Sequence, residues 1–254
     1  MNGLVHILAQ KISFASILVL FFMGGHTPVN AQDTNEQSSR SLAALSEYIV
    51  ELYGTNNIVV NGRSYIPDHY NAKGHPYFSS DKLTKSTLVI DGKKYGNQEV
   101  LYNIETEKVI LKTTINTSDE VLLVLNTGFI DAFYLDGHYF VNGAKYFPES
   151  GFPGFLEQVF EGGFRVVTRH QKSFISQYTA NTPNGFYSGT TSVSYIFNKG
   201  EVEKLPTKNA LFKYFPDHKK EIKKFLRKYK IKYKQANAVQ LNKLFTYCDE
   251  ISSK

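Results

Sequence analysis

The chain has 254 residues, of which 42% are hydrophobic and 20% charged, and its formal net charge at pH 7 is +6. With 18 Gly, 8 Pro and a single Cys, this composition excludes collagen-like, intrinsically disordered and disulfide-scaffold proteins. One cysteine cannot form an intramolecular disulfide, so a hydrophobic core must stabilise the fold by itself.

The first 31 residues follow the order that is typical of a secretory signal peptide. They contain one basic residue, Lys11, and no acid, and an apolar run over 12–23 precedes Gly24. This run is too short to span a bilayer, which takes about 20 helical residues. Val29 and Ala31 are small residues that predict cleavage before Gln32. We therefore expect export to the periplasm or the extracellular space, with no transmembrane span in the mature chain.

The mature chain is expected to begin with a linker and a helix. Residues 32–40 contain no apolar side chain, which predicts a flexible linker. Leu42, Leu45, Ile49 and Leu52 then repeat at helical spacing before Gly54, which predicts a short amphipathic helix over 41–53.

From residue 58 to 200 the pattern indicates antiparallel strands joined by tight turns. Asn-Gly or Asp-Gly pairs stand at 61–62, 91–92, 136–137 and 142–143, and these pairs favour type I′ hairpin turns. The expected strands are rich in β-branched and aromatic residues and cover 109–115, 121–125, 129–135, 164–168 and 192–197. Within this region, the apolar spacing of 154–163 and its final glycine pair predict a helical turn.

Beyond residue 200 we expect helices with a strong positive charge. Asp217 is predicted to cap a helix with an apolar face formed by Ile222, Phe225, Leu226 and Tyr229, and a second helix is predicted over 238–249, with Cys248 on its buried stripe. Residues 201–254 contain 14 bases and 6 acids and therefore carry a net charge of +8, whereas residues 32–200 carry −3.

Together these elements predict an α+β fold that is mainly antiparallel β, as a sandwich or a partly closed barrel, with a short N-terminal helix and a C-terminal helical segment. The expected divisions are a signal peptide over 1–31, a linker over 32–40, a β-rich domain with its leading helix over 41–200, and a basic helical segment over 201–254 that packs on the sheet.

Three stretches of the mature chain, at 74–78 (GHPYF), 95–111 and 215–225, resemble uncharacterised secreted β-rich proteins of the Bacteroidota. The resemblance implies a bacterial cell-envelope setting. It implies no activity and no site residues.

Candidates for chemistry are few in the sequence. The histidines of the mature chain show no metal-ligand spacing, and no glycine-rich loop has the context of a phosphate site, so we expect no metal, no cofactor and no nucleotide. The segment 188–192 (SGTTS) is the nearest approach to a nucleophile loop but lacks the Gly-x-Ser-x-Gly elbow. Glu157 and Glu161 could present two carboxylates on one helical face, as an acid and base pair requires, but a solvated helix face explains them more simply.

The most distinctive local feature is a basic face on the helix predicted after Asp217. Opposite the apolar stripe, seven cations form this face: Lys219, Lys220, Lys223, Lys224, Arg227, Lys228 and Lys230. Such a face can bind an envelope protein or an anionic envelope polymer or lipid, with nucleic acid less favoured, or can be a solvated surface. The sequence thus favours a non-enzymatic envelope protein that binds another macromolecule; the alternative is an envelope hydrolase with a site assembled only in three dimensions.

Overall fold

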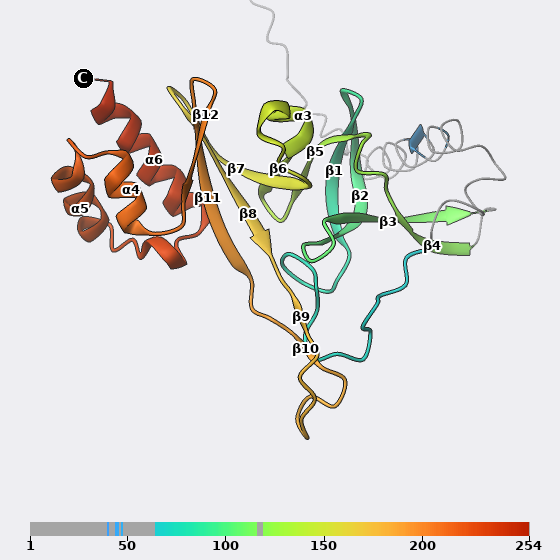
Figure 1. Cartoon of the computed structure of the whole chain (residues 1–254). Coiled ribbons are helices and arrows are strands. Elements are labelled where there is room, and N and C mark those ends of the chain that lie inside the picture. The colour runs from blue at the N-terminus through green and yellow to red at the C-terminus, as the bar shows by residue number, and fades with distance from the viewer. Residues whose placement is uncertain (1–39, 41–43, 46, 48–63, 116–118, 254) are drawn as a thin grey trace, which may run out of the picture.

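The computed structural model describes residues 40, 44–45, 47, 64–115 and 119–253 (Figure 1). Its elements, in chain order, are β1 (Thr84–Ile90), β2 (Lys93–Asn103), β3 (Lys108–Ile115), β4 (Asp119–Val124), β5 (Ile130–Leu135), β6 (His138–Asn142), α3 (Gly143–Tyr146), η1 (Pro148–Ser150), β7 (Phe155–Glu161), β8 (Arg165–Gln171), β9 (Phe174–Ile175), β10 (Phe186–Tyr187), β11 (Thr191–Asn198), β12 (Glu201–Leu205), α4 (Lys208–Tyr214), α5 (Lys219–Lys228), η2 (Tyr233–Gln235) and α6 (Ala238–Ser252).

One large antiparallel sheet organises the molecule. Its ten strands follow the order β12-β11-β8-β7-β6-β5-β1-β2-β3-β4, and a separate pair, β9 and β10, forms a small second sheet. Strand β1 pairs with both β5 and β2, so it connects strands β2–β4 on one side to the strands from β5 onward on the other. Among the strands of the described chain, β12 and β4 are the two edges of the large sheet. The predicted α+β class with a mainly antiparallel sheet is therefore confirmed.

Two of the predicted hairpin turns have the expected backbone. Asp91 and Gly92 both have positive φ between β1 and β2, as do Asp136 and Gly137 between β5 and β6. Two consecutive positive φ angles define a type I′ turn. The pair at 61–62 lies outside the described residues.

The Asn-Gly pair at 142–143 was predicted as a hairpin turn, and that prediction is wrong. Asn142 instead caps α3, because its side chain accepts a hydrogen bond from the amide of Ala144. Gly143 is required by close packing, since a Cβ atom there would lie 2.8 Å from the carbonyl oxygen of Phe152.

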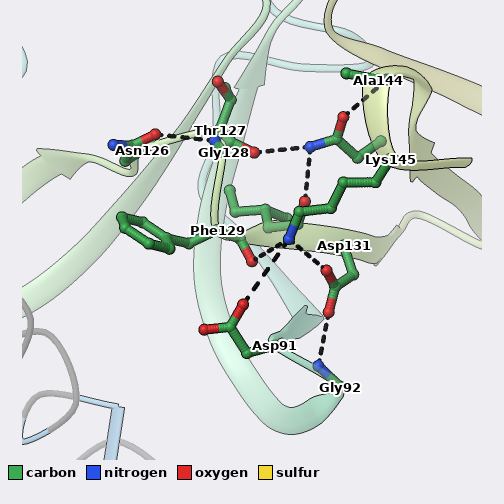
Figure 2. A network of polar contacts seen from close by, with 11 residues as sticks. Asp91, Gly92, Asn126, Thr127, Gly128, Phe129, Asp131, Ala144 and Lys145 are labelled. Atoms are coloured by element: carbon green, nitrogen blue, oxygen red, sulfur yellow. Dashed lines mark hydrogen bonds and ion pairs between the residues drawn. The ribbon is translucent and has the colours of Figure 1, made fainter. Parts of the chain in front are cut away.

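A polar network around Lys145 of α3 connects this helix to the β1–β2 turn and to the start of β5 (Figure 2). The ammonium of Lys145 donates to Asp131 and, at 3.1 Å, to the carbonyl of Phe129, and it lies 3.9 Å from Asp91. Asp131 also accepts the amide of Gly92 at 2.7 Å. This network positions the β1–β2 turn against the start of β5 and against α3.

The three C-terminal helices cover one end of the sheet (Figure 1). Residues of β7, β8, β11, β12 and the helices share one buried cluster, in which Leu244, Phe245 and Cys248 of α6 are fully buried. The amide of Asn242 also donates to the carbonyl oxygen of Val159 at 2.7 Å. The predicted buried stripe with Cys248 is confirmed. A second cluster lies under β1, β2, β3, β5 and β6 and includes Leu45.

Several predicted boundaries change. Residues 154–163 contain the strand β7 instead of a helical turn, because this segment pairs with both β6 and β8. The chain beyond 200 begins with a strand, β12, and a helix that was not predicted, α4. The N-cap of α5 is His218 instead of Asp217. Of the predicted helix at 41–53, Ala44, Leu45 and Glu47 are described and helical, as is Arg40, and the remainder lies outside the described residues.

Candidate functional site

Six of the seven cations of the predicted basic face lie on α5, and the seventh, Lys230, lies two residues past its end. All seven are exposed. Ile222 and Leu226, on the opposite side of the helix, are buried in the cluster below, and Phe225 is half-buried. Tyr229, the last residue of the predicted apolar face, remains 37% exposed. Within the described part of the chain, no ion pair joins any of the seven cations to an acid.

A second cluster, of buried polar residues, lies on the sheet under the C-terminal segment. Glu157 of β7 is paired across the strands with Thr168 of β8, which is paired with Ser194 of β11. Residues that are paired across antiparallel strands project from the same face. All three side chains are buried, and the Thr168 and Ser194 hydroxyls lie 3.1 Å apart in a hydrogen bond. The sheet therefore presents a row of polar groups to the segment that covers it.

Glu157 is the centre of this cluster and is only 3% exposed. Its Oε2 atom accepts a hydrogen bond from Nε2 of His170 at 2.8 Å, and its Oε1 atom accepts one from Nδ1 of His138. The three residues come from β6, β7 and β8, three neighbouring strands of the sheet. A buried carboxylate that accepts one imidazole N–H at each oxygen has both oxygens hydrogen-bonded, so the group can stay ionised away from water.

His170 connects this carboxylate to a hydroxyl at the surface. Its Nδ1 atom lies 2.8 Å from Oγ of Ser192, the residue directly opposite on β11. Because Nε2 carries the hydrogen that is bonded to Glu157, Nδ1 of the neutral ring has no hydrogen and accepts. The Ser192 hydroxyl therefore donates to Nδ1. Ser192 is exposed, while the His170 side chain is only 11% exposed. The result is a chain of hydrogen bonds from an accessible hydroxyl through an imidazole to a buried carboxylate.

The electrostatics of the cluster follow from these contacts. Burial alone would raise the pKa of the Glu157 carboxyl, but the hydrogen bonds from His138 and His170 outweigh burial, and its pKa lies below the ordinary value. The hydrogen bond to Glu157 raises the pKa of His138 above its usual 6.5, against the opposing effect of burial. The carboxylate is thus held ionised at neutral pH, as a group that orients and stabilises a protonated imidazole must be.

A pocket of about 460 Å³ opens over this cluster. One wall is the sheet, with His138, Glu157, Thr168, His170, Ser192 and Ser194. The other wall is formed by η2 and the start of α6, with Tyr233, Lys234, Asn237 and Leu241. The phenol of Tyr233 donates to the carbonyl oxygen of Leu205 at 2.9 Å and so fixes this wall against the last strand.

The comparisons with known proteins add no assignment. No family model, curated protein or solved structure matches the chain.

Two absences hold for the part of the chain that the structure describes. No group of three or more His, Cys, Asp or Glu side chains there could hold a metal ion. None of its helices combines the length and the apolar character that crossing a membrane requires.

The structure separates the two carboxylates that the sequence placed on one helical face. Glu157 is at the centre of the cluster, whereas Glu161 is exposed and forms an ion pair with Arg165 at 3.0 Å. A bulge between Gln158 and Phe160 interrupts the strand between them. Of the segment 188–192, only Ser192 contacts a histidine. The Ser188 hydroxyl instead accepts the backbone N–H of Ser173 and donates to the carbonyl oxygen of Gly189.

The two histidines of the site were not singled out from the sequence. They are 32 positions apart, and neither is separated from its partners by a number of residues that is typical of a metal-binding or catalytic motif. The one signal that could have found them is strand register. Once β8 and β11 are paired, His170 and Ser192 are opposite one another.

Proposed function

We propose that the chain is an exported cell-envelope hydrolase that cleaves esters by acyl transfer to Ser192. The observation that carries this proposal is the hydrogen-bonded sequence Ser192, His170, Glu157 at the wall of a pocket. An accessible hydroxyl next to an imidazole, with the imidazole oriented by a carboxylate, is the arrangement that activates serine as a nucleophile.

Each residue has a defined role in this reaction. Oγ of Ser192 attacks the acyl carbon and forms the new C–O bond, while its proton moves to Nδ1 of His170. The imidazolium is stabilised by the ionised Glu157 at Nε2. The leaving alkoxide takes the proton from His170, which leaves an acyl-enzyme. Water then attacks this ester with His170 again as the base, and Ser192 is regenerated.

The two ring nitrogens of His170 exchange the roles that they have in chymotrypsin-like proteases. Nδ1 is the nitrogen nearer the backbone, so it faces the cross-strand neighbour Ser192, while Nε2 extends to Glu157. Either nitrogen of a neutral imidazole can accept a proton when the other donates to an acceptor. The reversed orientation therefore supports the same chemistry.

His138 positions the carboxylate and does not contact the nucleophile. Its Nδ1 atom donates to the Glu157 oxygen that His170 does not use. This contact fixes the rotation of the carboxylate, so that Oε2 points to His170. We therefore assign His138 as a positioning residue.

The pocket lining favours a short acyl group on a polar alcohol. Hydroxyl groups of Thr168, Thr191 and Ser194 line the sheet side, and the small apolar patch is formed by Leu205, Pro206, Ala236, Ala238 and Leu241. A volume of about 460 Å³ lies toward the lower end of the range of about 300–1,000 Å³ for small-molecule sites. A long acyl chain would need a larger apolar surface.

Covalent labelling tests the nucleophile without knowledge of the natural substrate. The purified protein is incubated with a fluorophosphonate, which reacts with activated serine hydroxyls, and the labelled peptide is identified by mass spectrometry. We expect one label at Ser192, and no label in Ser192→Ala. Hydrolysis of p-nitrophenyl acetate is measured in parallel, with an expected loss of at least about 10³-fold in that variant.

Ser253→Ala is the matched control, since Ser253 is an exposed serine at the far end of α6. It should label and hydrolyse like the wild type. If the wild type is not labelled, or if the label lies on a serine other than Ser192, the proposal is wrong. The polar cluster would then serve stability or binding, as the non-enzymatic alternative requires.

A further inference from the structure

A groove lies between α5 and α6 and is lined by residues of α6 other than those that line the proposed ester site. It has a volume of about 630 Å³. Phe225, Tyr229 and Tyr247 form its floor, with the Phe225 and Tyr247 rings stacked at 4.2 Å and the Phe225 and Tyr229 rings 4.5 Å apart. The groove therefore has an aromatic base that is only partly covered by other side chains.

Lysines surround this aromatic floor. Lys224 and Lys228 stand on α5 at i and i+4, and Lys243 stands on α6. The ammonium group of Lys243 lies 3.5 Å from the centre of the Tyr229 ring, and that of Lys228 lies 5.3 Å from it. The face of an aromatic ring attracts cations at such distances. Two ammonium groups therefore lie close together beside the Tyr229 ring, at one end of the groove.

These lysines are continuous with the basic face of α5. Lys220, Lys224 and Lys228 form one row along the helix and Lys219, Lys223 and Arg227 an adjacent row, because residues four apart share a side. Two acids also line the groove, Glu221 and Glu250. Within the described chain, neither acid lies in an ion pair with the lysines. With Lys230 and Lys243 added to the two rows, this surface carries eight cations and two acids.

Apolar groups stand beside the charges. Val239, at the start of α6, is 77% exposed and lines the same groove, and Tyr229 is 37% exposed. An exposed apolar side chain and a tyrosine among lysines match the layered chemistry of a bilayer surface, which has anionic phosphates outside and acyl chains just below. A dissolved polyanion would use the charges and leave Val239 without a contact.

We propose that this groove and the basic face of α5 dock the protein on an anionic phospholipid membrane. The lipid phosphates contact Lys224, Lys228 and Lys243, and Val239 with the edge of Tyr229 enters the interfacial layer. The apolar stripe of α5 is already used in the core, so the helix docks without inserting. This inference rests on the helices alone and does not depend on Ser192.

Co-sedimentation with vesicles tests the proposal. One set of vesicles contains phosphatidylcholine with phosphatidylglycerol, and the other contains phosphatidylcholine alone. We expect binding only to the first set, and we expect this binding to weaken as salt is raised, because the Debye length falls below about 10 Å above 0.1 M. The triple variant Lys224→Glu, Lys228→Glu, Lys243→Glu should bind at least about tenfold more weakly.

The matched control changes the same net charge at a remote surface. Lys82, Lys93 and Lys94 are exposed and lie at and before the β1–β2 hairpin, outside the half of the sheet on which the C-terminal helices pack. Their triple exchange to Glu should leave vesicle binding within about twofold of the wild type. Val239→Ser, which keeps every charge, should weaken binding to vesicles but not retention on heparin.

Three results would overturn the inference. These are no binding of the wild type to anionic vesicles at low salt, an equal loss in the groove and remote triple variants, and retention on heparin without binding to vesicles. The last result would indicate a soluble polyanion as the partner. Unfolding midpoints of all variants are measured first, to show that the exposed substitutions leave the fold intact.

Discussion

Replacing Glu157 by Gln should destabilise the protein far more than the same change at Glu161, although the two residues lie on one strand. Glu157 is buried and accepts hydrogen bonds from two histidines, whereas Glu161 is exposed and pairs with Arg165 at the surface. Both substitutions remove one negative charge and keep the side-chain volume. The comparison therefore isolates the effect of the buried environment.

The magnitude follows from the contacts that are lost. A glutamine side chain at this position would offer one acceptor oxygen, so one imidazole N–H keeps a partner, although that bond loses its charge assistance at a cost of about 1 kcal/mol. The other N–H would face the new NH₂ group, and a buried donor without a partner costs about 1–3 kcal/mol. The expected loss is therefore roughly 2–4 kcal/mol, or a fall in Tm of roughly 4–16 °C for a chain of this size. The exposed ion pair of Glu161 contributes at most about 1 kcal/mol.

The variant should also change the dependence of stability on pH. The lowered pKa of Glu157 adds stability that is present above its ordinary value of 4.5 and is lost as the pH falls through the folded value. The raised pKa of His138 adds stability that is complete below 6.5 and is lost as the pH rises through the folded value. Both contributions are present between about pH 5 and 6.5, and Glu157→Gln should remove this dependence.

Urea unfolding at several pH values, followed by far-ultraviolet circular dichroism, measures both effects. A constant m-value shows that the change concerns stability and not the extent of the transition. Equal losses for the two Gln variants, or an unchanged pH profile for Glu157→Gln, would refute the assignment of Glu157 as an ionised, doubly bonded group.

Two further predictions concern the turns and the thiol. Gly92→Val and Gly137→Val should each lower the free energy of unfolding by about 1–3 kcal/mol, since a β-branched residue is strained at positive φ. Gly189→Val, at a position with open space and no positive φ, should lower it by less. Equal losses of stability at all three positions would contradict the turn assignment. Burial raises the pKa of the Cys248 thiol to about 12, so this thiol should not react with iodoacetamide at pH 8 in the folded protein but should react in urea, as mass spectrometry would show.

The sequence was informative where a signal is local. The pairs at 91–92 and 136–137 impose positive φ by themselves, and the stripe of Leu241, Leu244, Phe245 and Cys248 repeats at helical spacing, so both were predicted correctly. The turn at Lys199-Gly200 has the same conformation but was missed, because lysine is not typical of its first position.

Strand β7 was misread because it is buried on both sides. Phe155 and Leu156 are neighbours in the sequence and are both fully buried, one in the cluster under β1–β3 and the other in a separate cluster. A strand of this kind does not alternate between apolar and polar residues, so its spacing can be mistaken for that of a helix.

The candidate site could not be derived from the sequence because its four residues come from four strands. His138, Glu157, His170 and Ser192 span 54 positions, and only the registers of β6, β7, β8 and β11 bring them together. Register depends on which faces are buried, and this depends in turn on where the C-terminal helices pack. Glu157 and the segment ending at Ser192 could be named as candidates, but their connection through His170 could not.

The two edge strands of the large sheet bear on how the protein behaves at high concentration. A free edge exposes unpaired N–H and C=O groups, to which a strand of another molecule can add. Edge strand β12 is exposed at four of its five residues, which include Glu201, Glu203 and Lys204, and β4 begins with the exposed Asp119 and Glu120. The backbone N–H of Tyr65 already donates to the carbonyl oxygen of Leu122 on β4 at 2.8 Å. Edge β12 is thus protected by charged side chains, and edge β4 by charged side chains and by the chain at Tyr65. These features should prevent strands of different copies from pairing into fibrils. We expect substitutions that neutralise the charges at either edge to promote aggregation.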